Sequence, residues 1–221
     1  MKSVLISIQP YWVFLIIAKA MGWKVDKEKT IEVRKNLPKD ANWDKSVKVY
    51  CSKDGRSFST IPKEYQPAMK QFLGKVVGEF VCDKTFDICI EASDPDELPG
   101  YPFPCTGLTD KEILQYLGNG KTGYGWHISQ LKIYDEPKPL WDFMKCGAPT
   151  ENELDEELCS YCEPTEWGER KCYGTPDGPV MCEGAFCGEA YDLYLDEHFV
   201  LKRPPQSWCY VEKENDYVER H

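Results

Sequence analysis

The segment 29–35 places a hydroxyl, a carboxylate and a guanidinium on one side of a predicted strand. Side chains alternate between the two faces of a strand, so its apolar members are expected to point into a core while the other face holds Thr30, Glu32 and Arg34. Such a face is either the solvated side of an edge strand or the polar floor of a ligand pocket. An anion beside a cation suits the second use, because together they accept from and donate to a polar ligand.

Cysteines form the second group of chemically active residues, and six of the 11 fall between Cys146 and Cys187. A C-x2-C pair on a turn presents two thiolates to a metal, and a second pair completes a tetrahedral zinc site. The surrounding segment has few apolar residues with which to build its own core, so a metal would stabilise it. We therefore expect a structural zinc bound by Cys159, Cys162, Cys182 and Cys187, with Cys146 and Cys172 as further candidates.

The net charge of -10 belongs to one part of the chain. Residues 146–199 hold 14 acidic and two basic residues, a charge of -12, so the remaining residues sum to +2. The composition therefore does not exclude a phosphate backbone as a partner for the rest of the chain. The acidic segment itself could mimic nucleic acid or dock a basic partner.

Cysteine usage and hydropathy indicate a reducing, cytoplasmic setting. An odd number of cysteines without a secretory leader argues against a disulfide framework. The apolar run 13–18 is too short to span a bilayer and follows Pro10, which suits the first turn of a helix. We expect a buried helix over 11–21, with Leu15 and Ile16 in the core, and no membrane partner.

The strand pattern indicates an α+β fold. Short alternating segments recur with turn signals between them, which favours a small mixed β-barrel over a parallel sheet. Residues 83–106 show no periodicity and are expected to form a surface loop, whereas Thr109 and Glu112 form a capping box that starts a short helix. A further helix is expected over 188–197. The strands are expected at residues 4–8, 29–35, 46–52, 74–82, 124–134 and 207–212.

Five segments in a fixed order resemble the ASCH family: 3–10 (SVLISIQP), 28–35 (EKTIEVRK), 74–80 (GKVVGEF), 124–129 (YGWHIS) and 203–211 (RPPQSWCYV). The resemblance implies a PUA-like mixed β-barrel with peripheral helices, in bacteria or their phages. It also implies binding of RNA or modified nucleosides. We expect residues 1–145 and 200–213 to form this barrel, 146–199 to form an acidic, zinc-binding insertion, and 214–221 to be a frayed tail.

Some members of the ASCH family are amidohydrolases that deacetylate N4-acetylcytidine, using a Lys, a Thr nucleophile and a Glu. Lys29 takes the position of the Lys, but the nucleophile position falls on Glu32, and Thr30 lies two residues too early. A carboxylate cannot replace the hydroxyl nucleophile without a change of mechanism. Glu79 is a candidate for the family's Glu. The catalytic set is therefore left unassigned, and a nucleoside amidohydrolase is the alternative function.

The expected ligand pocket lies between three strands, those of Lys29, Trp126 and Trp208. Its predicted ligand-binding residues are Lys29, Thr30, Glu32, Arg34, Trp126, His127 and Trp208. The two tryptophans are interpreted either as stacking surfaces for a base or as core aromatics, and His127 as a pocket residue or a structural one. The function that the resemblance to the ASCH family implies is that of a module that binds RNA, DNA or a modified nucleoside. A protein-interaction adaptor that uses the acidic insertion is a further alternative.

Overall fold

The computed structural model describes residues 2–40, 43–91, 105–148, 162–164, 170–172, 180–182 and 194–212. The chain divides into two units, one built from Met1–Leu140 and Arg203–His221 and the other from Trp141–Lys202. In the first unit the helices are α1 (Pro10–Ile17), α2 (Gly55–Ser59), α3 (Gln66–Met69), the 3-10 turn Lys70–Phe72 and α4 (Asp110–Leu117). Its strands are β1 (Lys2–Ile8), β2 (Ile31–Arg34), β3 (Trp43–Cys51), β4 (Lys75–Val81), β5 (Thr85–Ile88), β6 (Gly123–His127), β7 (Ser129–Pro139) and β11 (Trp208–Glu212).

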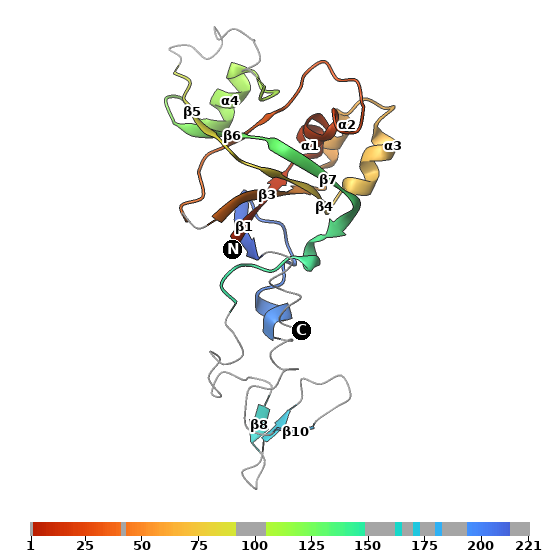
Figure 1. The fold of residues 1–221 in the computed structure, drawn as a ribbon, viewed down its shortest axis with the longest axis vertical. Coiled ribbons are helices and arrows are strands. Elements are labelled where there is room, and N and C mark those ends of the chain that lie inside the picture. The colour runs from red at the N-terminus through yellow and green to blue at the C-terminus, as the bar shows by residue number, and fades with distance from the viewer. Residues whose placement is uncertain are drawn as a thin grey trace. The chain divides into compact units, whose positions relative to one another are not determined.

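These strands form two sheets (Figure 1). The larger has the order β11-β1-β3-β4-β7, with β1 and β3 parallel and its other neighbours antiparallel. The smaller is antiparallel with the order β2-β6-β5. The fold is therefore α+β, as expected, but the described strands do not close into one barrel.

The predicted strand over 124–134 is divided between the two sheets, which is why these strands do not form the single predicted barrel. This segment divides after His127, because β6 pairs with β2 and β5 whereas β7 pairs with β4. Gln130 lies in the left-handed region, with φ 49°. This residue lies within β7, where the pairing register with β4 shifts, so it marks a bulge in that strand. The two halves of the segment therefore belong to different sheets.

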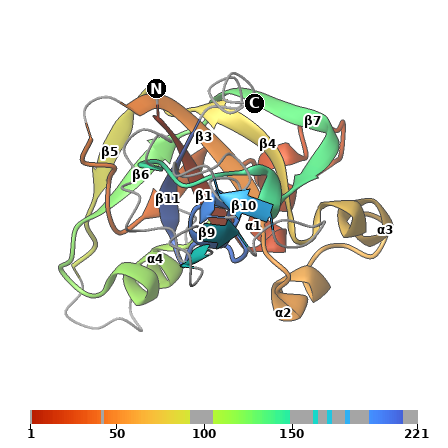
Figure 2. The same ribbon diagram turned by 90° about the horizontal axis from the view of Figure 1, so that it is seen from below.

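Helix α1 anchors the main core against the larger sheet. It begins at Pro10, whose fixed φ suits the first helical turn, and ends at Ile17, earlier than the predicted residue 21. Leu15 and Ile16 are 3% and 4% exposed, which confirms their predicted burial. The apolar side chains of α1 pack with those of β1, β3 and β4 in one cluster. In Figure 2, α2 and α3 lie on the opposite side of this unit from α4.

Helix α4 covers one face of the smaller sheet. Thr109 and Glu112 form the predicted capping box at its start. Its buried residues pack in a second core formed by Val33, Ile88, Ile113 and Leu117. A Cβ at Gly123 would lie 2.3 Å from Leu117 Cδ2, so only glycine lets the helix approach β6 this closely. The strand β5 contributes to this core although its residues lie in the predicted surface loop.

The second unit contains three short strands, β8 (Cys162–Pro164), β9 (Arg170–Cys172) and β10 (Val180–Cys182), in the order β10-β9-β8. Residues 194–198 are helical, within the predicted helix 188–197, whose earlier part lies outside the described residues. The predicted tail 214–221 also lies outside them. In the described part of the chain, no helix is long and apolar enough to cross a membrane.

Candidate ligand-binding site

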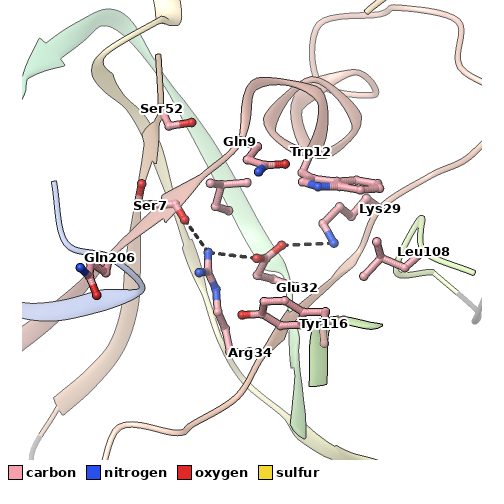
Figure 3. Close-up of a pocket in the computed structure, with 12 residues that line it drawn as sticks. Ser7, Gln9, Trp12, Lys29, Glu32, Arg34, Ser52, Leu108, Tyr116 and Gln206 are labelled. Atoms are coloured by element: carbon pink, nitrogen blue, oxygen red, sulfur yellow. Dashed lines mark hydrogen bonds and ion pairs between the residues drawn. The ribbon is translucent and has the colours of Figure 1, made fainter. Parts of the chain in front are cut away.

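A pocket of about 350 Å³ lies in the first unit, where the polar face of β2 meets the end of β1 (Figure 3). Its wall is completed by five other parts of the chain: the start of α1, the residue after β3, the segment before α4, α4 itself and the segment before β11. The sequence brings these pieces together only through the fold, since they are spread over 200 residues. The lining residues are Ser7, Ile8, Gln9, Trp12, Lys29, Glu32, Val33, Arg34, Ser52, Leu108, Tyr116 and Gln206.

Glu32 lies between two cations in this pocket. Its Oε2 is 3.1 Å from Lys29 Nζ and its Oε1 is 3.0 Å from Arg34 Nη2. The exposed fractions of the side chains are 2% for Lys29, 8% for Glu32 and 6% for Arg34. The prediction that Glu32 and Arg34 share a face with each other is thus confirmed. The alternative of a solvated surface pair is wrong, because Ser7 of the larger sheet binds Arg34 and Trp12 of α1 lies over Lys29 on this face.

All three N–H donors of Lys29 Nζ have acceptors within the protein. Its Nζ donates to the carbonyl oxygens of Thr106 at 2.8 Å and Ile31 at 3.0 Å, in addition to the Glu32 carboxylate. Burial lowers the pKa of Lys29, while the charge of Glu32 acts in the opposite direction. Three acceptors match the three donors of an ammonium group, which favours the protonated form. Lys29 therefore has a structural role in holding Glu32, and has no donor left for a phosphate.

Arg34 is fixed by the backbone of the larger sheet, yet one of its nitrogens has no hydrogen-bond partner among the described residues. Its Nη2 donates to Ser7 O at 2.9 Å and its Nη1 to Ser207 O at 3.4 Å. Its Nε is buried and has no hydrogen-bond partner among the described residues. The same holds for the hydroxyl oxygen of Ser52. A buried unpaired donor costs free energy that a ligand acceptor would recover.

Two aromatic side chains contribute to the pocket wall. The ring of Trp12 lies over Lys29, with Nζ 5.5 Å from the ring centroid. Tyr116 is 39% exposed, and Lys35 Nζ lies 5.1 Å from its ring centroid. Burial raises the pKa of the Tyr116 hydroxyl and the charge of Glu32 acts in the same direction, whereas Arg34 opposes them through its charge and a side-chain hydrogen bond. At neutral pH the phenol is therefore a neutral donor and acceptor at the pocket.

Four of the predicted ligand-binding residues do not line the pocket. Trp126, the cross-strand partner of Glu32, is fully buried in the main core and does not line the pocket, so it cannot be a stacking wall. Trp208 packs against the same core and makes an edge contact with Tyr210. The Nδ1 of His127 lies 2.6 Å from Asp83 Oδ1. Thr30 uses its backbone N–H to bind Cys105 O, and it is absent from the lining.

Sequence reasoning missed Trp12, Tyr116 and Ser52. Trp12 lies in an apolar helix where a core position was the natural interpretation, and Tyr116 lies in a short capped helix with no chemical motif. Their role depends on how α1 and α4 pack against β2, for which the sequence offers no local signal. The candidate acid Glu79 is not in the pocket, since it lies 3.2 Å from Lys48 Nζ on the larger sheet.

Two of the four predicted zinc ligands, Cys159 and Cys187, lie outside the described residues. Among the residues that are described, no three His, Cys, Asp or Glu gather closely enough to hold a metal ion. The strand register makes Cys172 the cross-strand partner of Cys162, whereas Cys182 is opposite Arg170. Cys182 is therefore at the other end of these three-residue strands from Cys162 and Cys172.

No protein-family model and no curated protein matches the chain. The chain is similar to the crystal structure of ASCH from Zymomonas mobilis, with a TM-score of 0.38 and 15% identity over 98% of this chain and 93% of that one. A point mutant of the same protein gives a TM-score of 0.40 at 13% identity, over the same shares of the two chains. Both likenesses extend over most of the chain at low sequence identity.

Proposed function

We propose that the protein binds one nucleoside or modified nucleoside, free or as a unit of RNA, in the pocket of β2. The observation that carries this proposal is the buried carboxylate of Glu32 beside two aromatic side chains. Each carboxylate oxygen has two lone pairs, so Glu32 can accept from an exocyclic amine in addition to Lys29 and Arg34. Glutamate pairs in this way with the exocyclic amine of cytosine.

The size of the pocket supports a single unit. Small-molecule sites span about 300–1,000 Å³, so a volume near 350 Å³ suits one nucleoside. Trp12 and Tyr116 offer ring surfaces for a base, and stacking of this kind contributes about 1–3 kcal/mol per base. The Lys29–Glu32–Arg34 cluster is rigid, since backbone carbonyls hold both cations, so its hydrogen bonds need little ordering when a ligand binds.

The affinity for a nucleoside is expected to fall about 5- to 150-fold in Trp12→Ala, because the base loses its ring surface. Isothermal titration calorimetry with cytidine and N4-acetylcytidine measures this. Phe86→Ala is the matched control, since Phe86 is an exposed aromatic (44%) outside the pocket, and it should bind as the parent does. Failure of the parent to bind any nucleoside or oligoribonucleotide at low salt would reject the proposal.

The amidohydrolase alternative has less support from the pocket. Glu32 stands where a hydroxyl nucleophile would be needed, and both of its oxygens already bind cations. Incubation with N4-acetylcytidine, followed by chromatography for released cytidine, separates binding from catalysis. The adaptor alternative concerns residues 146–199 and would be favoured instead if their deletion abolished capture of a basic partner.

We also propose that the acidic, Cys-rich segment binds one structural zinc ion. Cysteine thiolates bind zinc more favourably than they bind hard cations. The six free thiols in the described part of the chain support a reducing, cytoplasmic setting, in which cysteines stay available to a metal. The strand register favours Cys172 as a ligand beside Cys162. Elemental analysis of reduced protein is expected to find about one zinc per chain, and Cys162→Ser to lower it. Metal-free protein with an unchanged proteolysis pattern in residues 146–199 would contradict this.

A further inference from the structure

The charged residues that line the pocket do not balance. Lys29 and Arg34 are both cations and Glu32 is the single anion among the lining residues, which leaves one net positive charge in a buried site. Lys35 adds a further cation beside Tyr116. This local excess contrasts with the net charge of -10 for the chain. Charges in a site of low dielectric interact more strongly than in water, so the excess favours an anionic ligand group.

The unpaired donor of Arg34 locates where that group would bind. The two N–H groups of Arg34 Nη2 are directed to Ser7 O and Glu32, one N–H of Nη1 is directed to Ser207 O, and Nε has no partner among the described residues. Arg34 as a whole is 5% exposed, so solvent does not readily satisfy this donor. In Figure 3, Ser7, Ser52 and Gln206 lie toward the side of Arg34, and Trp12 and Leu108 lie toward the side of Lys29. The pocket thus has a polar half and a more apolar half.

We propose that the ligand carries an anionic oxygen, of the phosphate or carboxylate class, which accepts from Arg34 Nε in the polar half of the pocket. The hydroxyl of Ser52 supplies a second hydrogen bond in this half. This inference rests on the proposed function, and it adds a preference for a nucleoside monophosphate over the nucleoside. The aromatic half holds the base in both cases, so the difference between the two ligands isolates the polar half.

The parent protein is expected to bind cytidine 5′-monophosphate at least about tenfold more tightly than cytidine at low salt, since a charge-assisted hydrogen bond is stronger than a neutral one. The advantage should shrink as salt is raised. Arg34→Lys keeps the positive charge but lacks the Nε–H, so it should lose most of this advantage, measured as the ratio of the two affinities. Titration calorimetry at two salt concentrations, with inorganic phosphate as a competitor, measures all of these quantities.

If Arg34→Lys fails to fold, Ser52→Ala tests the anion site instead. Its hydroxyl has no partner among the described residues, so its removal should leave thermal stability unchanged and lower the affinity for the monophosphate several-fold. Ser59→Ala is the matched control, because Ser59 is exposed and its hydroxyl binds only Arg56 O of its own helix. It should bind both ligands as the parent does.

The outcomes separate this inference from the proposed function. Equal affinity of the parent for cytidine and its monophosphate overturns the inference and leaves the nucleoside pocket standing. Binding of neither ligand rejects the proposed function and the inference together. Binding of inorganic phosphate without any nucleoside, lost in Arg34→Lys, retains the anion site and rejects the nucleoside.

Discussion

Glu32→Gln is expected to lower the free energy of unfolding by about 3–5 kcal/mol. The carboxylate neutralises two buried cations at once, and glutamine can offer each only a neutral partner. Lys29 and Arg34 would then lie buried without a counter-charge, and removal of one partner from a buried ion pair is strongly destabilising for this reason. The aligned backbone carbonyls around Lys29 and Arg34 compensate only in part.

Thermal unfolding followed by circular dichroism measures the effect, which should appear as a fall of about 6–20 °C in Tm for a chain of this size. Glu79→Gln is the matched control. Glu79 also pairs with a buried lysine, Lys48, but its own side chain is 30% exposed, so water compensates and the loss should stay within about 1 kcal/mol. Equal, small shifts in the two variants would show that the Glu32 cluster is no more buried in solution than a surface pair.

This expectation reverses one drawn from the sequence. The pocket predicted from the sequence implies that Glu32→Gln and Arg34→Ala abolish nucleoside or oligonucleotide binding and leave thermal stability nearly unchanged. The structure buries both faces of β2, with α4 on Val33 and the larger sheet beside Glu32. The alternation along β2 was therefore predictable, because it is a local property of the chain. Its surroundings were not, because they depend on helices distant in sequence.

The fold shows the same division between local and tertiary information. The capping box at Thr109, the start of α1 at Pro10 and most strands follow from neighbouring residues and were predictable. The separation of β6 from β7 was missed, although the apolar alternation shifts phase at Gln130, where Trp126 and Ile128 are followed by Leu131 and Ile133. Strand β5 was missed because four residues beside a Pro- and Asp-rich segment give too short a pattern.

The candidate site combines both kinds of information. Lys29, Glu32 and Arg34 were predictable because their types and spacing on one strand suffice to place them together. The tryptophans were misassigned because an aromatic on a strand has the same sequence signature whether it faces a ligand or a core. Trp126 faces the core and Trp12 faces the pocket, a difference decided by the packing of α1.

Trp126→Ala should therefore act on stability and spare the pocket. Removal of a fully buried tryptophan leaves a cavity that its neighbours fill only in part, with an expected loss of about 3–5 kcal/mol in the free energy of unfolding. The matched control is Trp141→Ala, because Trp141 is 69% exposed and its loss should change stability by no more than about 0.5 kcal/mol. Urea titrations with tryptophan fluorescence and circular dichroism as independent probes measure both variants.

The binding measurement distinguishes a core residue from a stacking wall. Below its lowered unfolding transition, Trp126→Ala should bind cytidine within a few-fold of the parent, since the pocket is lined by Trp12 and Tyr116 instead. A stacking residue would behave in the opposite way, with unfolding nearly unchanged and affinity reduced about 5- to 150-fold. If Trp126→Ala behaved as a stacking residue does, the ligand would lie against Trp126 on β6, and the assignment of the pocket to α1, β2 and α4 would be wrong.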